Sequence, residues 1–183
     1  TKADWKTHHV LLRVNFPVDV NTKYASFEIQ FGNVERETTC NQSWDSAKFE
    51  VCGHKWADIS EYNGGISLLN DCKYGYGVKN GNFSMTLIKS GTYPNKNADI
   101  GFHEFTYSIY AHPGRWQEAE TVQMAYNLNI PLFVSVQKGR EENIKRECQN
   151  IIPESVIQIN REECFLETVK KSEDGKDWII RLY

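Results

Sequence analysis

Several features that direct a protein to a membrane or to nucleic acid are missing from this sequence. No apolar run in its 183 residues approaches the ~20 needed to cross a bilayer. The N-terminus also lacks the apolar stretch of a secretory signal. The 21 Lys and Arg residues are outnumbered by 24 Asp and Glu residues, so no excess of positive charge favours binding to phosphate backbones. We therefore expect neither a membrane nor a nucleic-acid partner.

The sequence contains few cysteines, and their spacing suggests no pairs. The five cysteines are odd in number and far apart, and no C-x-x-C pair suggests a structural zinc site. They are Cys40, Cys52, Cys72, Cys148 and Cys164. A secreted disulfide scaffold normally uses an even set in a shorter chain. We therefore expect free thiols and a cytoplasmic location.

Motifs that mark a catalytic or metal centre are also missing. The five histidines do not form H-E-x-x-H or a similar ligand set. The sequence has no serine nucleophile elbow, phosphate loop or Gly-rich dinucleotide turn. A glycosidase needs two carboxyl groups at one cleft, and no motif surrounds such a pair here. The sequence therefore predicts neither a catalytic residue nor a metal ligand in this chain.

Short β-strand patterns are plentiful instead. Residues 9–16 are apolar or alternating and end at Pro17, and Tyr24 to Phe31 place apolar side chains at every second position before Gly32 and Asn33. An Asn80-Gly81 pair between two β-rich segments predicts a tight hairpin. Further strands are expected at residues 49–51, 66–69, 83–87 and 105–110. The fold class predicted is mainly β.

The β-strand patterns are interrupted after residue 113 and return only near the C-terminus. Residues 116–127, after Pro113-Gly114 and before Pro131, form the one good helical stretch in the first two thirds. Residues 137–150 are dense in charge and predict an exposed loop. Terminal strands are expected within 155–183, at 155–159, 164–170 and 178–183, with a turn at 173–177. We interpret residues 1–183 as a single β-sandwich region that is truncated at both ends.

The stretch from Trp44 to Tyr76 combines aromatic rings with amide, carboxylate and ammonium groups. A sugar site needs this combination, because sugar C–H faces stack on rings while hydroxyls need directional polar partners. A buried aromatic core with satisfied polar groups would have the same composition. The residue types alone leave both interpretations open.

Several segments in one order resemble a known family. They are Ser43-Trp44-Asp45, Ala47 to Val51, His54 to Ser60, Leu68 to Tyr76, Gly101 with His103 to Tyr107, Lys170 to Gly175 and Ile180 to Tyr183. Together they resemble the region that follows the catalytic domain in cytosolic-type α-mannosidases of glycoside hydrolase family 38. The family often has Pro and His where this chain has Glu37 and Cys40, and an aromatic residue in the turn at 63–65, so local turn shapes differ.

The resemblance implies an antiparallel β-sandwich of the galactose-mutarotase-like supersandwich type. It implies a parent enzyme that is zinc-dependent, retains configuration and removes α-linked mannose. The nucleophile and the zinc ligands would lie upstream of Thr1, on a catalytic α/β domain of the same polypeptide. This chain would then hold no cofactor and would be inactive alone, with the zinc in the parent enzyme. Its partners would be that catalytic domain, mannosides or oligosaccharides, and in a homo-oligomer a second copy.

The family's β-sandwich supplies part of the active-site wall, and residues 70–76 are the best candidates for it here. The substrate-binding candidates are Asn70, Asp71, Lys73, Tyr74 and Tyr76, with His103 and Asp99 as secondary choices. The alternative is that Asp71 and Lys73 pair with each other or with loop backbone. A second hypothesis for the whole chain is a stand-alone carbohydrate-binding or structural module.

Overall fold

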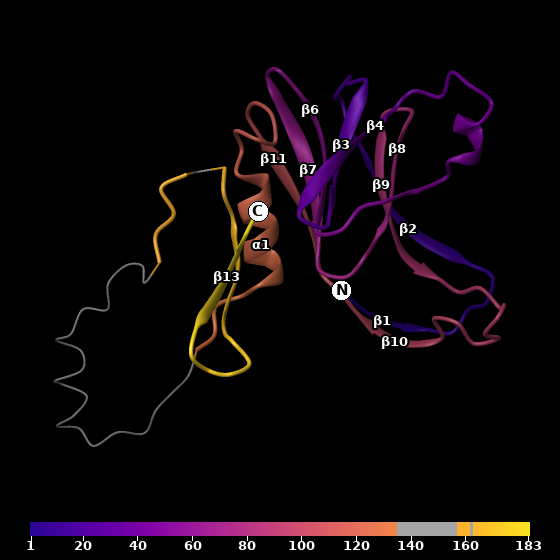
Figure 1. Ribbon diagram of the computed structural model, residues 1–183. Coiled ribbons are helices and arrows are strands. Elements are labelled where there is room, and N and C mark those ends of the chain that lie inside the picture. Colours follow the sequence, from indigo (N-terminus) through magenta and orange to yellow (C-terminus); the bar gives the residue numbers. More distant parts are fainter. Residues whose placement is uncertain (135–156, 162) are drawn as a thin grey trace. The chain divides into compact units, whose positions relative to one another are not determined.

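A computed structural model describes residues 1–134, 157–161 and 163–183 (Figure 1). The chain divides into two compact units, Thr1–Pro131 and Leu132–Tyr183. The exposed charged loop predicted at 137–150 lies outside the described residues. The interpretation of residues 1–183 as one β-sandwich region stays a prediction.

Two antiparallel sheets form most of the first unit. The larger has the order β11-β7-β6-β3-β4 and the smaller the order β2-β9-β8-β5. The strands of the larger sheet are β3 (Tyr24–Ile29), β4 (Gly32–Glu37), β6 (Trp56–Glu61), β7 (Gly64–Asn70) and β11 (Tyr107–His112). Those of the smaller are β2 (Leu11–Pro17), β5 (Val51–Cys52), β8 (Gly75–Lys79) and β9 (Asn82–Lys89). A separate pair consists of β1 (Lys2–Trp5) and β10 (Gly101–Glu104).

The hydrophobic core lies between the two sheets. The larger sheet contributes Phe27, Ile59 and Leu68, and the smaller contributes Tyr76, Phe83 and Met85. Each of these side chains is at most 1% exposed. Burial of apolar area at about 25 cal/mol per Å² makes this shared core the main stabilising contact between the sheets. The predicted mainly-β, antiparallel sandwich is confirmed.

The alternation at Tyr24 to Phe31 forms strand β3, but the strand ends at Ile29. Ile29 is opposite Gly32, so Gln30 and Phe31 make a two-residue turn, and Phe31 has a left-handed φ of 56°. The strand expected to run to Phe31 therefore ends two residues earlier, and Gly32 opens the next strand, β4. A tight turn reverses the chain there, which period-two alternation does not reveal.

The hairpin predicted at Asn80-Gly81 is confirmed. Lys79 is opposite Asn82, so the two residues between them form the whole loop. Their φ angles are 53° and 71°. Both lie in the left-handed region that a type I′ turn requires and that Asn and Gly tolerate best. Strands β8 and β9 are joined in register by this turn.

The helix begins later than the sequence predicts. It is α1 (Thr121–Asn129), and residues 116–120 form turns instead. Glu120 has a left-handed φ of 53°, which cannot continue from a preceding helical turn. Trp116 packs on Trp56, with ring centroids 4.8 Å apart, and this contact with the sheet holds the turn. The helix ends at Asn129, two residues before Pro131, as expected.

A buried polar cluster joins α1 to the outer face of the larger sheet. Nε2 of His112 donates to Oδ2 of Asp58 at 2.8 Å, and the Ser67 hydroxyl donates to the same oxygen at 2.7 Å. The Thr121 hydroxyl lies 2.9 Å from that of Ser67. All four residues are buried. The cluster therefore connects β6, β7 and the end of β11 to the first residue of the helix.

The second unit contains a single described hairpin, β12 (Leu166–Lys171) and β13 (Trp178–Leu182). The backbone N–H of Ser172 donates to the carbonyl of Asp177 at 2.9 Å, which closes the predicted turn at 173–177. The last two predicted strands are thus confirmed within two residues. The first, at 155–159, is wrong for its described residues 157–159, because no strand pairs with them.

Among the described residues, no helix has both the length and the apolar composition that crossing a membrane requires. The same residues contain no group of three His, Cys, Asp or Glu side chains arranged to hold a metal ion.

Candidate functional site

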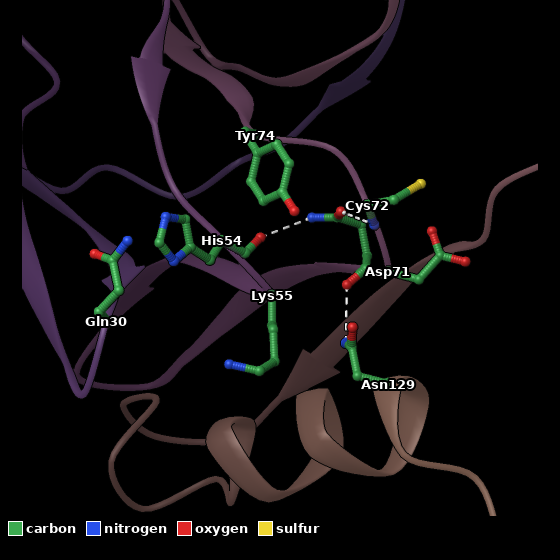
Figure 2. Close-up of a pocket in the computed structure, with 8 residues that line it drawn as sticks. Gln30, His54, Lys55, Asp71, Cys72, Tyr74 and Asn129 are labelled. Atoms are coloured by element: carbon green, nitrogen blue, oxygen red, sulfur yellow. Dashed lines mark hydrogen bonds between the residues drawn. The ribbon is translucent and has the colours of Figure 1, made fainter.

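A pocket of about 530 Å³ opens beside the end of strand β7. Eight residues from strand ends, turns and the end of α1 line it (Figure 2). They are Gln30, His54, Lys55, Asn70, Asp71, Cys72, Tyr74 and Asn129. Pockets of 300–1,000 Å³ with a few convergent polar groups are typical of small-molecule sites.

Asn70 fixes the shape of this pocket. Its side-chain amide donates to the His54 carbonyl at 2.9 Å and to the Tyr76 hydroxyl. Its side-chain oxygen accepts from the backbone N–H groups of Cys72, at 2.9 Å, and of Lys73. These bonds hold the turn after β7 in a single conformation. Asn70 is 1% exposed, so no water can replace a partner that its amide loses. Asn70 is therefore a structural anchor of the site.

Two further contacts attach distant segments to this anchor. The side-chain amide of Asn129, at the end of α1, donates to the Asn70 carbonyl at 2.9 Å. The buried Tyr76 hydroxyl donates to the His54 carbonyl at 2.8 Å. Burial raises the pKa of Tyr76 far above its ordinary value, so its hydroxyl stays protonated and keeps this bond. These contacts tie the turn after β7 to the segment before β6, to β8 and to the end of α1.

The ammonium of Lys55 is already engaged inside the pocket. It lies 2.7 Å from Oε1 of Glu28, whose carboxylate is almost fully buried. It also lies 4.7 Å from the centre of the Tyr126 ring. A buried carboxylate requires such a partner, because an unpaired buried charge is costly. Lys55 therefore contributes a neutralised ion pair to the pocket.

Tyr74 and His54 provide the groups that are most open to a ligand. Their rings meet edge to face, with centroids 5.6 Å apart and planes at 85°. Tyr74 is 58% exposed, and among the described residues no hydrogen bond of its hydroxyl is found. Aromatic edges beside an open hydroxyl can contact both the C–H face and the hydroxyls of a sugar.

Asp71 is the one carboxylate among the lining residues. Its Oδ2 accepts from the Thr106 backbone N–H at 2.9 Å. Partial burial raises the pKa of Asp71, but hydrogen bonds from the Cys72 thiol and the Thr106 N–H outweigh burial and hold that pKa below its ordinary value. Partial burial, and then the Asp71 carboxylate, raise the pKa of the Cys72 thiol to about 11. Asp71 is thus a charged acceptor and Cys72 a neutral thiol at pH 7.

The candidates chosen from sequence separate into two groups. Asn70, Asp71 and Tyr74 line the pocket. Lys73, Tyr76 and His103 are not among the lining residues. Lys73 places its ammonium 4.3 Å from the centre of the Phe105 ring, and Nε2 of His103 lies 2.8 Å from the Asp99 carbonyl oxygen. No ion pair joins Asp71 to Lys73 in the described part of the chain, and Asp71 instead binds loop backbone.

Sequence reasoning did not name five lining residues individually as site candidates, although His54, Lys55 and Cys72 lie within the stretch 44–76 that it singled out. The five are Gln30, His54, Lys55, Cys72 and Asn129. Pairing of β6 with β7 brings Lys55 beside Asn70, whose N–H donates to the Lys55 carbonyl at 2.9 Å. That pairing could have been inferred from the short connection between the two strands. Nothing local marks Asn129, which is 59 residues from Asn70 in the sequence.

A serine, a histidine and an aspartate also lie together in the Asp58, Ser67 and His112 cluster. This arrangement differs from a nucleophilic triad, because Ser67 donates its proton directly to Asp58. The side chains of His112 and Asp58 are 0% and 1% exposed, so no substrate can reach them. The cluster is structural, and the pocket around Asn70 is the better candidate site.

Comparison with known proteins gives consistent relatives. A sequence model described as "Glycosyl hydrolases family 38 C-terminal domain" matches residues 1–97. The chain is 43% identical to α-mannosidase G of Dictyostelium discoideum over 183 residues, which are 100% of this chain and 16% of that protein. It is 38% identical to human α-mannosidase 2C1 over 186 residues, covering 100% of this chain and 17% of that one. An α-mannosidase of Saccharomyces cerevisiae is 38% identical over 95% of this chain and 15% of its own length.

Solved structures show the same fold at low identity. A family 38 glycosyl hydrolase protein from Enterococcus faecalis superimposes with a TM-score of 0.73 at 18% identity, covering 99% of this chain and 21% of that one. An α-mannosidase from Enterococcus faecalis V583 gives 0.64 at 19% identity over 76% of this chain and 17% of its own. This chain therefore spans about one sixth to one fifth of the proteins that it matches.

Proposed function

Since the chain belongs to the family 38 glycosyl hydrolases, as part of their C-terminal domain, we propose that it is the non-catalytic β-sandwich portion of an α-mannosidase. The parent enzyme would remove terminal α-linked mannose from mannosides or oligosaccharides. The support is that relatives named α-mannosidase align with the whole of this chain and are about six times as long. Their length favours this proposal over a stand-alone module.

The chemistry of the pocket agrees with a supporting role. A retaining glycosidase places two carboxyl groups roughly 5 Å apart across the scissile bond. In the pocket around Asn70, Asp71 contributes one carboxylate, and the nearby Glu28 carboxylate is bound to Lys55. We propose that the catalytic carboxylates and the zinc belong to the catalytic α/β domain of the same polypeptide. The chain would contribute positioning contacts and no step of bond cleavage.

The pocket around Asn70 is the part of the chain that we assign to the active-site wall. The observation that carries this assignment is the turn built on Asn70, which places the exposed Tyr74 side chain and the Asp71 carboxylate in the lining of one pocket. A hydroxyl and a carboxylate on a fixed backbone can orient sugar hydroxyls, or position a neighbouring catalytic carboxylate. Lys73 stays a candidate for the second role only, because it lies outside the lining.

The test is made in the full-length enzyme with Tyr74→Phe. The Tyr74 hydroxyl has no partner in the described residues, so its loss should leave the thermal midpoint unchanged. If that hydroxyl binds substrate in the transition state, kcat/KM should fall about tenfold, equivalent to ~1.4 kcal/mol. Tyr62→Phe is the matched control, because Tyr62 is 88% exposed and lies outside the pocket.

Asp71→Ala and Lys73→Ala complete the series. A wall role for either residue requires kcat/KM per folded molecule to fall while the midpoint changes little. A purely structural role predicts lost stability with intact specific activity, because orphaned backbone donors cost about 1–3 kcal/mol each. Unchanged kcat/KM in all three variants would remove this turn from the active site while leaving the family assignment intact.

The proposed location is the cytoplasm. Among the described residues, Cys40, Cys52, Cys72 and Cys164 are all free and exposed. Exposed unpaired thiols fit a reducing compartment better than an oxidising one. A homo-oligomeric parent enzyme is also part of the proposal.

A further inference from the structure

A second pocket, of about 570 Å³, opens at one edge of the sandwich. Its lining includes residues of β4, at the edge of the larger sheet, of β5, at the edge of the smaller one, and of the segment 39–50 with its 3-10 turn η1 (Asp45–Ala47). Phe27 and Tyr76 form part of its apolar floor, and the exposed rings of Trp44 and Phe49 line its mouth. Its lining shares no residue with the pocket around Asn70.

Arg36 of β4 places a charged group in this pocket, and no described carboxylate pairs with it. Its Nη1 is buried and makes no hydrogen bond in the described part of the chain. The guanidinium lies 4.9 Å from the centre of the Phe27 ring. Burial lowers the pKa of Arg36, but a guanidinium remains protonated at neutral pH. A buried charged donor that lacks an acceptor is costly, so this group needs an explanation.

The carboxylates around the pocket do not satisfy Arg36. Asp45 binds the Lys48 ammonium at 3.1 Å, and Glu50 lies 3.5 Å from Nε of Arg13. Glu35 and Glu37 alternate with Arg36 along β4, so their side chains point to the opposite, exposed face of the strand. Across residues 1–134, 157–161 and 163–183, no ion pair joins Arg36 to a carboxylate.

We propose that this pocket is a binding site for a carboxylate group, which Arg36 holds through paired N–H donors. A planar guanidinium matches a carboxylate in this way and forms a short, charge-assisted pair. The carbon skeleton of the ligand would rest on the aromatic floor. Lys48 is paired with Asp45, and Lys79 donates to the Asp45 carbonyl, so Arg36 offers one positive charge, which fits a monoanion better than a phosphate dianion. The carboxylate belongs to a free organic acid or to the remainder of the polypeptide.

The first arm of the test measures binding of free acids to the full-length enzyme by calorimetry. The probes are propionate and glucuronate at constant ionic strength, with propionamide and glucose as their uncharged analogues. If the ligand is a free acid, the acids bind, their analogues do not, and Arg36→Met weakens binding by tenfold or more. Arg115→Met is the matched control, since Arg115 is exposed and lies outside the pocket. Acid binding that survives Arg36→Met would overturn the proposal.

The second arm applies if no free acid binds. It compares the thermal midpoint of the unmodified full-length enzyme with that of its Arg36→Met variant between pH 4 and pH 8. A carboxylate from the same polypeptide would be left unpaired in the variant, so the midpoint should fall at pH 7. The difference should shrink at low pH, because the abandoned carboxylate then takes up a proton. An unchanged or raised midpoint, or a loss that does not depend on pH, would overturn the proposal, since Arg36 would then have no carboxylate partner.

Discussion

Replacing His112 by Leu should strongly destabilise the first unit. The imidazole is fully buried and donates to the Asp58 carboxylate, which is 1% exposed and also accepts from Ser67. Leu has a similar volume but no donor, so the Asp58 carboxylate would keep one hydrogen bond and lose its closest partner. Its other oxygen, Oδ1, is buried and has no hydrogen-bond partner among the described residues.

The expected loss follows from the burial of both partners. Removing the closest hydrogen-bond donor of a buried carboxylate costs about 3–5 kcal/mol, because the carboxylate is left uncompensated in a low-dielectric environment. For a unit of this size, 1 kcal/mol corresponds to roughly 3 °C. The thermal midpoint should therefore fall by roughly 10–15 °C. The helix α1 should also loosen, since Thr121 is attached to the cluster through Ser67.

Thermal and urea unfolding of the purified chain, followed by circular dichroism, measure this loss. Adding Asp58→Asn to His112→Leu removes the stranded charge and should restore at least about 2 kcal/mol, which is the coupling expected of residues in contact. His103→Leu is the matched control, because His103 makes one bond to a carbonyl at the surface and should change stability by less than about 1 kcal/mol. A loss below about 1 kcal/mol in His112→Leu, or further destabilisation by Asp58→Asn, would refute the reasoning.

Three other predictions concern thiols and activity. With its pKa raised to about 11, Cys72 should react with iodoacetamide roughly tenfold more slowly at pH 8 than an ordinary thiol, since the smaller thiolate fraction outweighs the greater nucleophilicity of each thiolate. The alkylation rate of Cys72 should keep rising toward pH 11. Mass spectrometry that shows Cys72 alkylated as fast as Cys164 at pH 8 would contradict this. Thiol titration of denatured, unreduced protein should find five free cysteines, and any stable disulfide would count against a cytoplasmic location. The purified chain should not hydrolyse an aryl α-mannoside, because it lacks a motif for a carboxylate pair, and turnover that survives repurification and zinc removal would overturn the non-catalytic role.

Local patterns in the sequence determined the strands and turns whose chemistry is contained in a few residues. Alternation from Tyr24 to Ile29 requires two faces of different polarity, which only an extended strand provides. The pair Asn80-Gly81 meets the left-handed φ requirement of a two-residue turn. The turn at 173–177 is also local, because hydrogen bonds between residues a few positions apart close it. These elements follow from sterics and periodicity, so they are readable before any partner is known.

Part of the candidate site could also be predicted from the sequence. Asn70, Asp71 and Tyr74 belong to one short segment of the chain. They therefore lie close together in space, and a site that includes one of them was expected to include the others. The residues Gln30, His54 and Asn129 join them only through strand pairing and the position of α1. Hydrogen bonds of this kind connect residues tens of positions apart, and no local pattern encodes them.

Tertiary contacts decided the elements for which propensity was ambiguous. Residues 116–120 have helical composition, yet packing of Trp116 on Trp56 and the left-handed Glu120 make them a turn. Arg36 has an ordinary strand position in the sequence, and only the folded chain shows that its Nη1 is buried at a pocket with no acceptor among the described residues. The sequence determined which segments are β because that preference is local, whereas burial and polar pairing depend on which segments meet in space.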